Sequence, residues 1–104
     1  MKTLHLVLQS KWFDKVASGE KTSEYREIKP YWNKRFTGMS ERYFQLLMGD
    51  GVSAPQKYAT VVFHKGYTTT TMEFAIISIK TIINRPNDLG LDKCWEIKLG
   101  KRIK

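Results

Sequence analysis

The chain has 104 residues, 41% hydrophobic and 27% charged, a composition that fits one globular domain and excludes a disordered chain. No apolar run reaches the length of a membrane helix and the N-terminus lacks the order of a signal peptide, so we expect a cytoplasmic protein with no membrane partner. Eighteen Lys and Arg against ten Asp and Glu give a net charge of +8, which fits an anionic partner, most often nucleic acid, as well as it fits mere solubility.

The first third of the chain predicts a strand, a helix and a second strand. Leu4-His5-Leu6-Val7-Leu8-Gln9 alternates as a strand with one buried side does. Ser10 offers an N-cap for a short helix, which Gly19 ends in a left-handed conformation. The apolar stripe of this helix is Trp12, Phe13, Val16 and Ala17. Thr22 to Ile28 can then run as a short strand with Thr22, Glu24, Arg26 and Ile28 on one face.

Two helices are predicted next. Pro30 suits the first turn of a helix that Gly38 interrupts, and Ser40 can cap another that Gly49 closes. Asp50 to Gln56 reads as a loop.

The second half predicts strands. Tyr58 to His64 is rich in β-branched residues, and Lys65-Gly66-Tyr67 begins a turn into a strand from Met72 to Ile83. After a loop from Asn84 to Gly90, Lys93 to Leu99 forms a last strand that Gly100 ends. In the long strand we expect one face to be buried except at its Glu73 end, and this face consists of Glu73, Ala75, Ile77, Ile79 and Ile83.

These elements predict an α+β fold. Strands of varied length that outnumber the helices favour a small, strongly curved sheet or barrel with two or three helices packed outside it.

The segment Gly19-Glu20-Lys21-Thr22-Ser23-Glu24-Tyr25-Arg26-Glu27 holds ionisable residues of both signs and lies between an apolar strand-helix unit and the proline of the next helix. Such clusters mark functional sites more often than chance, and the alternative is an ion-pair cluster that only fixes a loop. A lysine paired with Glu24 would act as an electrostatic or hydrogen-bond donor to a phosphate or a base carbonyl. Glu24 could accept a hydrogen bond from an exocyclic amine, and Arg26 could bind phosphate.

Gly19-x-Lys21-x-x-Glu24-x-Arg26, after a helix that begins Lys11-Trp12-Phe13, resembles the G-x-K-x-x-E-x-R signature of the ASCH family. The resemblance extends to Glu27-Ile28-Lys29-Pro30-Tyr31-Trp32, Phe63-His64-Lys65-Gly66-Tyr67 and Trp95-Glu96-Ile97-Lys98-Leu99-Gly100. It implies a single domain over residues 1–104 with a PUA-like β-barrel of about five or six strands, whose cleft binds RNA or a nucleoside- or nucleotide-like ligand.

The resemblance also implies site residues. The ligand-binding candidates are Gly19, Arg26, Lys65 and Tyr67. Some small ASCH proteins look like amidohydrolases that act on N4-acylcytidine through the motif lysine, a threonine three positions later and a glutamate on a later strand. Here these positions hold Lys21, Glu24 and Ala75, with Glu73 nearby, so a hydrolase would use Lys21, Glu24 and Glu73. The alternatives are therefore a binding module, a hydrolase acting on acylcytidine or RNA, and a protein-interaction domain.

The remaining chemistry-bearing residues receive mostly structural interpretations. Tyr67 could stack on an unpaired base or pack as a rim tyrosine. Cys94, without a partner for a disulfide, is interpreted as a packing residue, and the same holds for Trp12, Trp32 and Trp95. His5 and His64 are interpreted as isolated structural histidines. We expect a monomer with no metal and no other cofactor.

Overall fold

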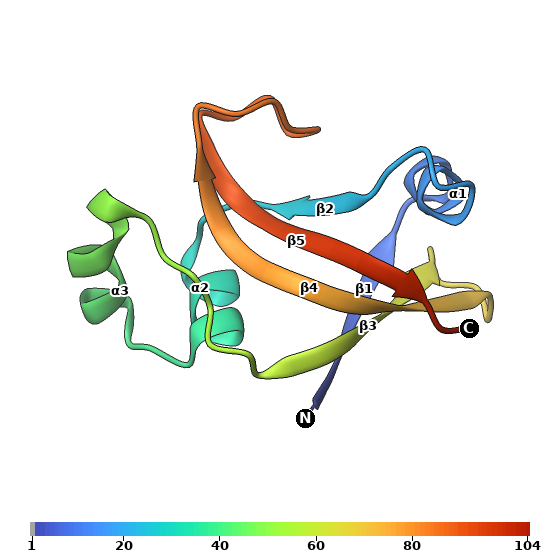
Figure 1. The fold of residues 1–104 in the computed structure, drawn as a ribbon, viewed down its shortest axis with the longest axis horizontal. Coiled ribbons are helices and arrows are strands. Elements are labelled where there is room, and N and C mark those ends of the chain that lie inside the picture. Colours follow the sequence, from blue (N-terminus) through green and yellow to red (C-terminus); the bar gives the residue numbers. More distant parts are fainter. Residues whose placement is uncertain (1) are drawn as a thin grey trace. The chain divides into compact units, whose positions relative to one another are not determined.

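A computed structural model describes residues 2–104 (Figure 1). In this range it has five strands, three α-helices and one 3₁₀ turn, which confirms the predicted α+β class and the expected numbers of strands and helices. In chain order these are β1 (Lys2–Leu8), α1 (Ser10–Ala17), β2 (Ser23–Arg26), α2 (Pro30–Thr37), α3 (Glu41–Leu47), η1 (Met48–Asp50), β3 (Tyr58–Lys65), β4 (Thr71–Ile83) and β5 (Lys93–Arg102).

The strands form one sheet in the order β1-β3-β4-β5-β2. β1 runs parallel to β3, and β3 runs antiparallel to β4. The residues group into two compact units. The first comprises the chain up to Glu24, Tyr58–Ile77 and Lys98–Lys104, and the second comprises Tyr25–Lys57 and Ser78–Ile97.

The core of the first unit follows the alternation of β1. Leu4, Leu6 and Leu8 are buried as predicted, and the parallel register sets Leu4 beside Val61 and Leu6 beside Phe63 on β3. Each of these strands thus contributes alternate side chains to one apolar layer. α1 adds Phe13 and Val16, which are also buried. The predicted cap of α1 is wrong by one residue: Gln9 is the N-cap and Ser10 the first helical residue.

In the part of β4 that belongs to the first unit, the buried face is the one opposite to the predicted face. Met72, Phe74 and Ile76 are buried, whereas Ile77 is 59% exposed and Glu73 and Ala75 are partly exposed. Apolar residues occupy both faces of this strand, so alternation alone does not decide which face meets the core. In the second unit the buried positions of β4 are Ile79 and Ile82, three residues apart, which is not the period of a regular strand.

Trp95 of β5 is the centre of the second unit's core. It is fully buried, with the rings of Phe36 and Phe44 at centroid distances of 5.3 and 5.8 Å. Its Nε1 donates a 2.9 Å hydrogen bond to Oδ1 of buried Asn33, whose Nδ2 donates to Glu41 at 3.0 Å. The polar edge of the indole is thereby satisfied inside the core.

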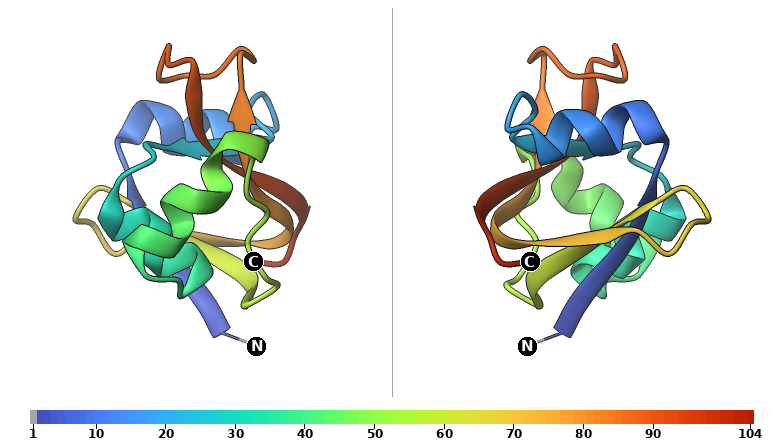
Figure 2. Two further views of the ribbon diagram at one scale, coloured as in Figure 1. Left: turned by 90° about the vertical axis from the view of Figure 1, so that its left-hand side faces the viewer. Right: turned by 90° about the vertical axis from the view of Figure 1, so that its right-hand side faces the viewer.

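The same network joins α2 to α3, which lie side by side (Figure 2). Hydrogen bonds from Asn33 and Gln45 lower the pKa of the Glu41 carboxyl below its ordinary value. Pro30 begins α2, and Gly38 ends it at φ 76° as predicted. Ser40 caps α3 by accepting a 3.3 Å hydrogen bond from the backbone N–H of Tyr43.

The predicted ends of two elements, α3 and β5, are wrong. Gly49 does not close α3 in a left-handed conformation, because the chain continues through η1, and it is Gly51 that has a φ of 84°. β5 does not end at Gly100 but continues to Arg102. A Cβ on Gly100 would lie 3.2 Å from Ile77 Cγ1, so this glycine provides room for a neighbouring side chain rather than a turn.

Cys94 is fully buried, which agrees with its interpretation as a packing residue. Burial raises the pKa of its thiol, and the nearby Glu96 carboxylate raises it further by a smaller amount. No helix within residues 2–104 has the length and hydropathy that a transmembrane helix requires.

Candidate functional site

The charged segment after α1 turns back onto the helix at Gly19. This residue has a φ of 83°, and its N–H donates to the carbonyl of Val16 at 3.1 Å. The N–H of Lys21 then donates to the carbonyl of Lys15 at 3.0 Å. The carbonyl of Thr22 accepts from Leu99 N–H at 3.1 Å, so the segment is fixed to both α1 and β5.

This path brings Lys21 and Glu24 together. Lys21 Nζ lies 3.0 Å from Glu24 Oε1, and the side chains are only 9% and 7% exposed. A charge removed from water to this degree requires a partner, and the pair neutralises itself. An ammonium in such an ion pair donates hydrogen bonds and has no lone pair for nucleophilic attack.

Three ammonium groups gather around the indole of Trp12. The Nζ atoms of Lys11, Lys15 and Lys21 lie 4.7, 5.2 and 5.0 Å from the ring centroid, which is within cation–π range. Trp12 is half-buried, and Lys11 and Lys15 are exposed. We call these four residues the Trp12 cluster. Lys11 and Lys15 are the part of this cluster that the sequence could have indicated, because residues four apart on a helix are neighbours on its surface.

The other predicted ligand-binding residues of this unit lie elsewhere. Lys65 Nζ forms an ion pair with Asp14 Oδ1 at 3.0 Å and lies 5.7 Å from the centre of the Phe13 ring. Tyr67 stands fully exposed on the turn after β3. Lys65 thus joins β3 to α1, while Tyr67 presents its ring to solvent.

Glu73 occupies the outward face of the sheet. It stands opposite Val62 in the β3–β4 ladder and alternates with Met72 and Phe74, which are buried. Glu24, in contrast, is itself buried. Glu73 is partly exposed, in agreement with the expected open end of this face, whereas Ala75 is partly exposed where burial was predicted.

Arg26 belongs to the second unit, where it forms part of another cationic aromatic cluster. Its guanidinium lies 5.1 Å from the centre of the Trp32 ring, and that of Arg35 lies at 5.7 Å. Nη1 of Arg35 also donates a 2.9 Å hydrogen bond to the hydroxyl of Tyr31. Trp32 is half-buried rather than a core residue, so of the three tryptophans only Trp95 is fully buried.

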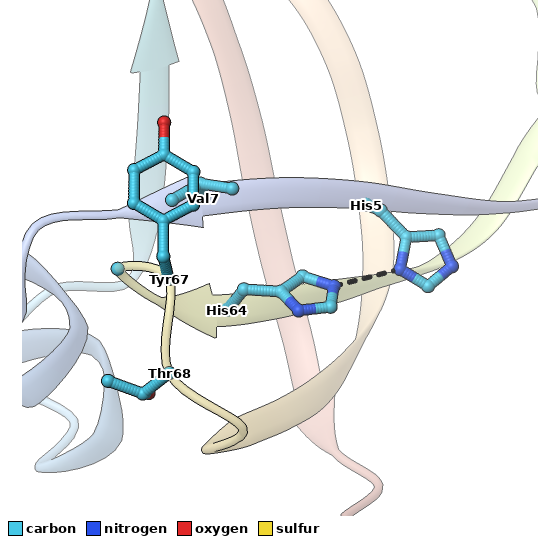
Figure 3. Close-up of a pocket in the computed structure, with 6 residues that line it drawn as sticks. His5, Val7, His64, Tyr67 and Thr68 are labelled. Atoms are coloured by element: carbon cyan, nitrogen blue, oxygen red, sulfur yellow. Dashed lines mark hydrogen bonds between the residues drawn. The ribbon is translucent and has the colours of Figure 1, made fainter.

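His5 and His64 are not isolated. They come from neighbouring strands of the first unit and are linked by a 3.0 Å hydrogen bond between His5 Nδ1 and His64 Nε2 (Figure 3). The pair opens onto a pocket of about 340 Å³ whose lining also includes Val7, Gly66, Tyr67 and Thr68. No local sequence pattern predicts this pairing, because it depends on the parallel register of β1 and β3.

Comparison with known proteins identifies no relative. None of the protein-family models searched matches this chain, and neither a curated protein nor a solved structure matches it significantly.

Proposed function

We propose that the first unit binds single-stranded RNA, or a nucleotide, through the Lys21–Glu24 pair and the Trp12 cluster. The observation that carries this proposal is the nearly buried Lys21–Glu24 ion pair with its ammonium 5.0 Å from an indole that two further lysines share. The resemblance of the motif to the ASCH signature supports the same class of ligand.

The cluster holds excess positive charge. Glu24 balances Lys21, but neither Lys11 nor Lys15 forms an ion pair within the described residues. Like charges four residues apart on a helix destabilise it by about 0.2–0.5 kcal/mol. A phosphate group bound between the two ammoniums would relieve this repulsion, and phosphate contacts dominate affinity for nucleic acid.

The aromatic and carboxylate groups beside these lysines can contact a base, which a patch of lysines alone does less well. Trp12 offers a ring on which a base can stack when a lysine moves aside. Glu24 can accept a hydrogen bond from an exocyclic base amine while it stays in contact with Lys21. In the second unit, Arg26 and Arg35 around Trp32 form a cluster of the same chemical kind.

The hydrolase alternative has less support. It needs a base or nucleophile, whereas Lys21 is bound in an ion pair and Glu73 lies on the outward face of the sheet. Incubation with N4-acetylcytidine, followed by absorbance, tests it directly, and turnover that Lys21→Gln abolishes would establish a hydrolase in place of a binding module.

The binding proposal is tested by fluorescence anisotropy with a labelled single-stranded RNA at low salt. Lys11→Gln/Lys15→Gln lowers the net charge by two, and the matched control Lys101→Gln/Lys104→Gln lowers it equally in the C-terminal tail. We expect the first variant to bind roughly tenfold more weakly and the control to bind nearly as the wild type does. A further variant, Lys21→Gln/Glu24→Gln, should also bind weakly while circular dichroism shows the native fold.

Equal losses in the two charge-matched variants would contradict the proposal, because the attraction would then follow net charge alone. Undetectable binding of the wild-type protein at low salt would contradict it as well.

A further inference from the structure

We propose that His5 and His64 form a binding site for a late first-row divalent metal ion, with Cu²⁺ bound most tightly. The site is separate from the Lys21–Glu24 pair and does not depend on the function proposed above. It uses the only two histidines of the chain.

The spacing of the two facing nitrogens suits a chelate. Metal–nitrogen distances for imidazole are about 2.0–2.1 Å, so two cis ligands at angles between square-planar and tetrahedral have nitrogens about 2.9–3.4 Å apart. His5 Nδ1 and His64 Nε2 are 3.0 Å apart. The rings are tilted by 38° with centroids 5.3 Å apart, so the facing nitrogens point at each other. Both rings must therefore turn until their lone pairs converge on one point.

The hydrogen bond between the rings leaves a simple route to metal binding. In the neutral pair, one facing nitrogen carries the proton that the other accepts. When that proton moves to the far nitrogen of its own ring, both facing nitrogens have lone pairs for the ion. Neutral imidazole is the form in which histidine binds metals.

The backbone holds the two histidines in register. In the parallel ladder His5 stands beside Val62, and His64 stands beside Val7. The side chains between them along each strand, Leu6 and Phe63, are buried, so both imidazoles lie on the outward face. Ligands on paired strands are fixed more precisely than ligands on loops.

The rest of the coordination sphere is open to solvent. No group of three or more His, Cys, Asp or Glu side chains arranged to hold a metal exists among residues 2–104. The Tyr67 hydroxyl points away from the two rings (Figure 3), and the pocket beside them has a volume of about 340 Å³. The site therefore has two protein ligands and exchangeable positions for water, which suits Cu²⁺, Ni²⁺ or Zn²⁺ and not the oxygen-seeking Mg²⁺ or Ca²⁺.

Calorimetric titration of untagged, chelator-treated protein with CuCl2, NiCl2, ZnCl2 and MgCl2 tests the proposal. We expect one Cu²⁺ per chain, weaker binding of Ni²⁺ and Zn²⁺, and none of Mg²⁺. His5→Gln and His64→Gln should each weaken Cu²⁺ binding by about tenfold or more, because each removes one of two ligands. Thr60→Val, which changes the same face of β3 and keeps both imidazoles, should leave the affinity unchanged.

Electron paramagnetic resonance of the Cu²⁺ complex gives a second readout that does not depend on stability. The wild-type spectrum should show two imidazole nitrogens and each single variant only one. The proposal is wrong if either single variant binds Cu²⁺ as tightly as the wild type, or if two ions bind with one nitrogen each. Either result would mean that His5 and His64 only form a hydrogen bond between β1 and β3 and do not chelate a metal ion.

Discussion

Two ion pairs in the first unit have the same length but differ in exposure. Lys21–Glu24 and Lys65–Asp14 both have nitrogen–oxygen distances of 3.0 Å, with side chains 9% and 7% exposed in the first pair and 32% and 62% exposed in the second. An exposed pair contributes little because water and salt screen it, whereas breaking a buried pair strands a desolvated charge.

Substitution of one carboxylate in each pair should separate these cases. Glu24→Gln is expected to lower the free energy of unfolding by about 3 kcal/mol because the nearly buried Lys21 ammonium loses the charge of the Glu24 carboxylate. Asp14→Asn should lower the free energy of unfolding by less than about 1 kcal/mol. Lys21→Gln/Glu24→Gln should recover part of the loss. Urea denaturation measures all three, and equal costs for Glu24→Gln and Asp14→Asn would show that burial does not govern these pairs.

At the scale of single elements, two glycines with open space around them differ in their backbone conformation. Gly38 ends α2 at φ 76°, whereas Gly49 lies within η1 and has no positive φ. A Cβ added to either would meet no atom within 4 Å. Any difference between the two substitutions therefore comes from the backbone conformation and not from packing.

Alanine at the two positions tests this separation. Gly38→Ala should lower the free energy of unfolding by about 1 kcal/mol, because an L-residue is strained in the left-handed region. Gly49→Ala should leave it unchanged or raise it by up to about 1 kcal/mol, because alanine restricts the unfolded chain. Thermal unfolding followed by circular dichroism compares them, and a loss at Gly49 as large as at Gly38 would contradict the argument.

At the scale of the whole molecule, the net charge of +8 attracts any polyanion. Such attraction is long-ranged and weakens with salt, whereas a phosphate bound at a defined cluster releases a fixed number of counterions. The salt dependence of RNA binding therefore distinguishes a local site from diffuse attraction.

A salt series on the two charge-matched variants makes this distinction. The slope of log K against log salt concentration should fall in magnitude by about 1.4 for Lys11→Gln/Lys15→Gln, since each phosphate contact on a single strand contributes about 0.7. Lys101→Gln/Lys104→Gln should keep the wild-type slope. Anisotropy titrations at four or more salt concentrations measure both slopes, and identical decreases would indicate that no cluster is preferred.

Local patterns in the sequence determined much of this protein's architecture. The alternation of Leu4, Leu6 and Leu8, the Ser40 cap and the stops at Gly19 and Gly38 depend on neighbouring residues and on intrinsic backbone preferences. The pairing of Lys21 with Glu24 is local too, since the two are three residues apart. The sequence therefore pointed to the centre of the candidate site.

The tertiary structure alone decided which face of β4 meets the core, because both faces of that strand carry apolar residues. It also decided that Glu73 faces outward and that His5 pairs with His64, 59 residues along the chain. Each of these facts depends on strand register and on which neighbour covers which face. Register is a property of pairs of distant segments, so no short stretch of sequence contains it.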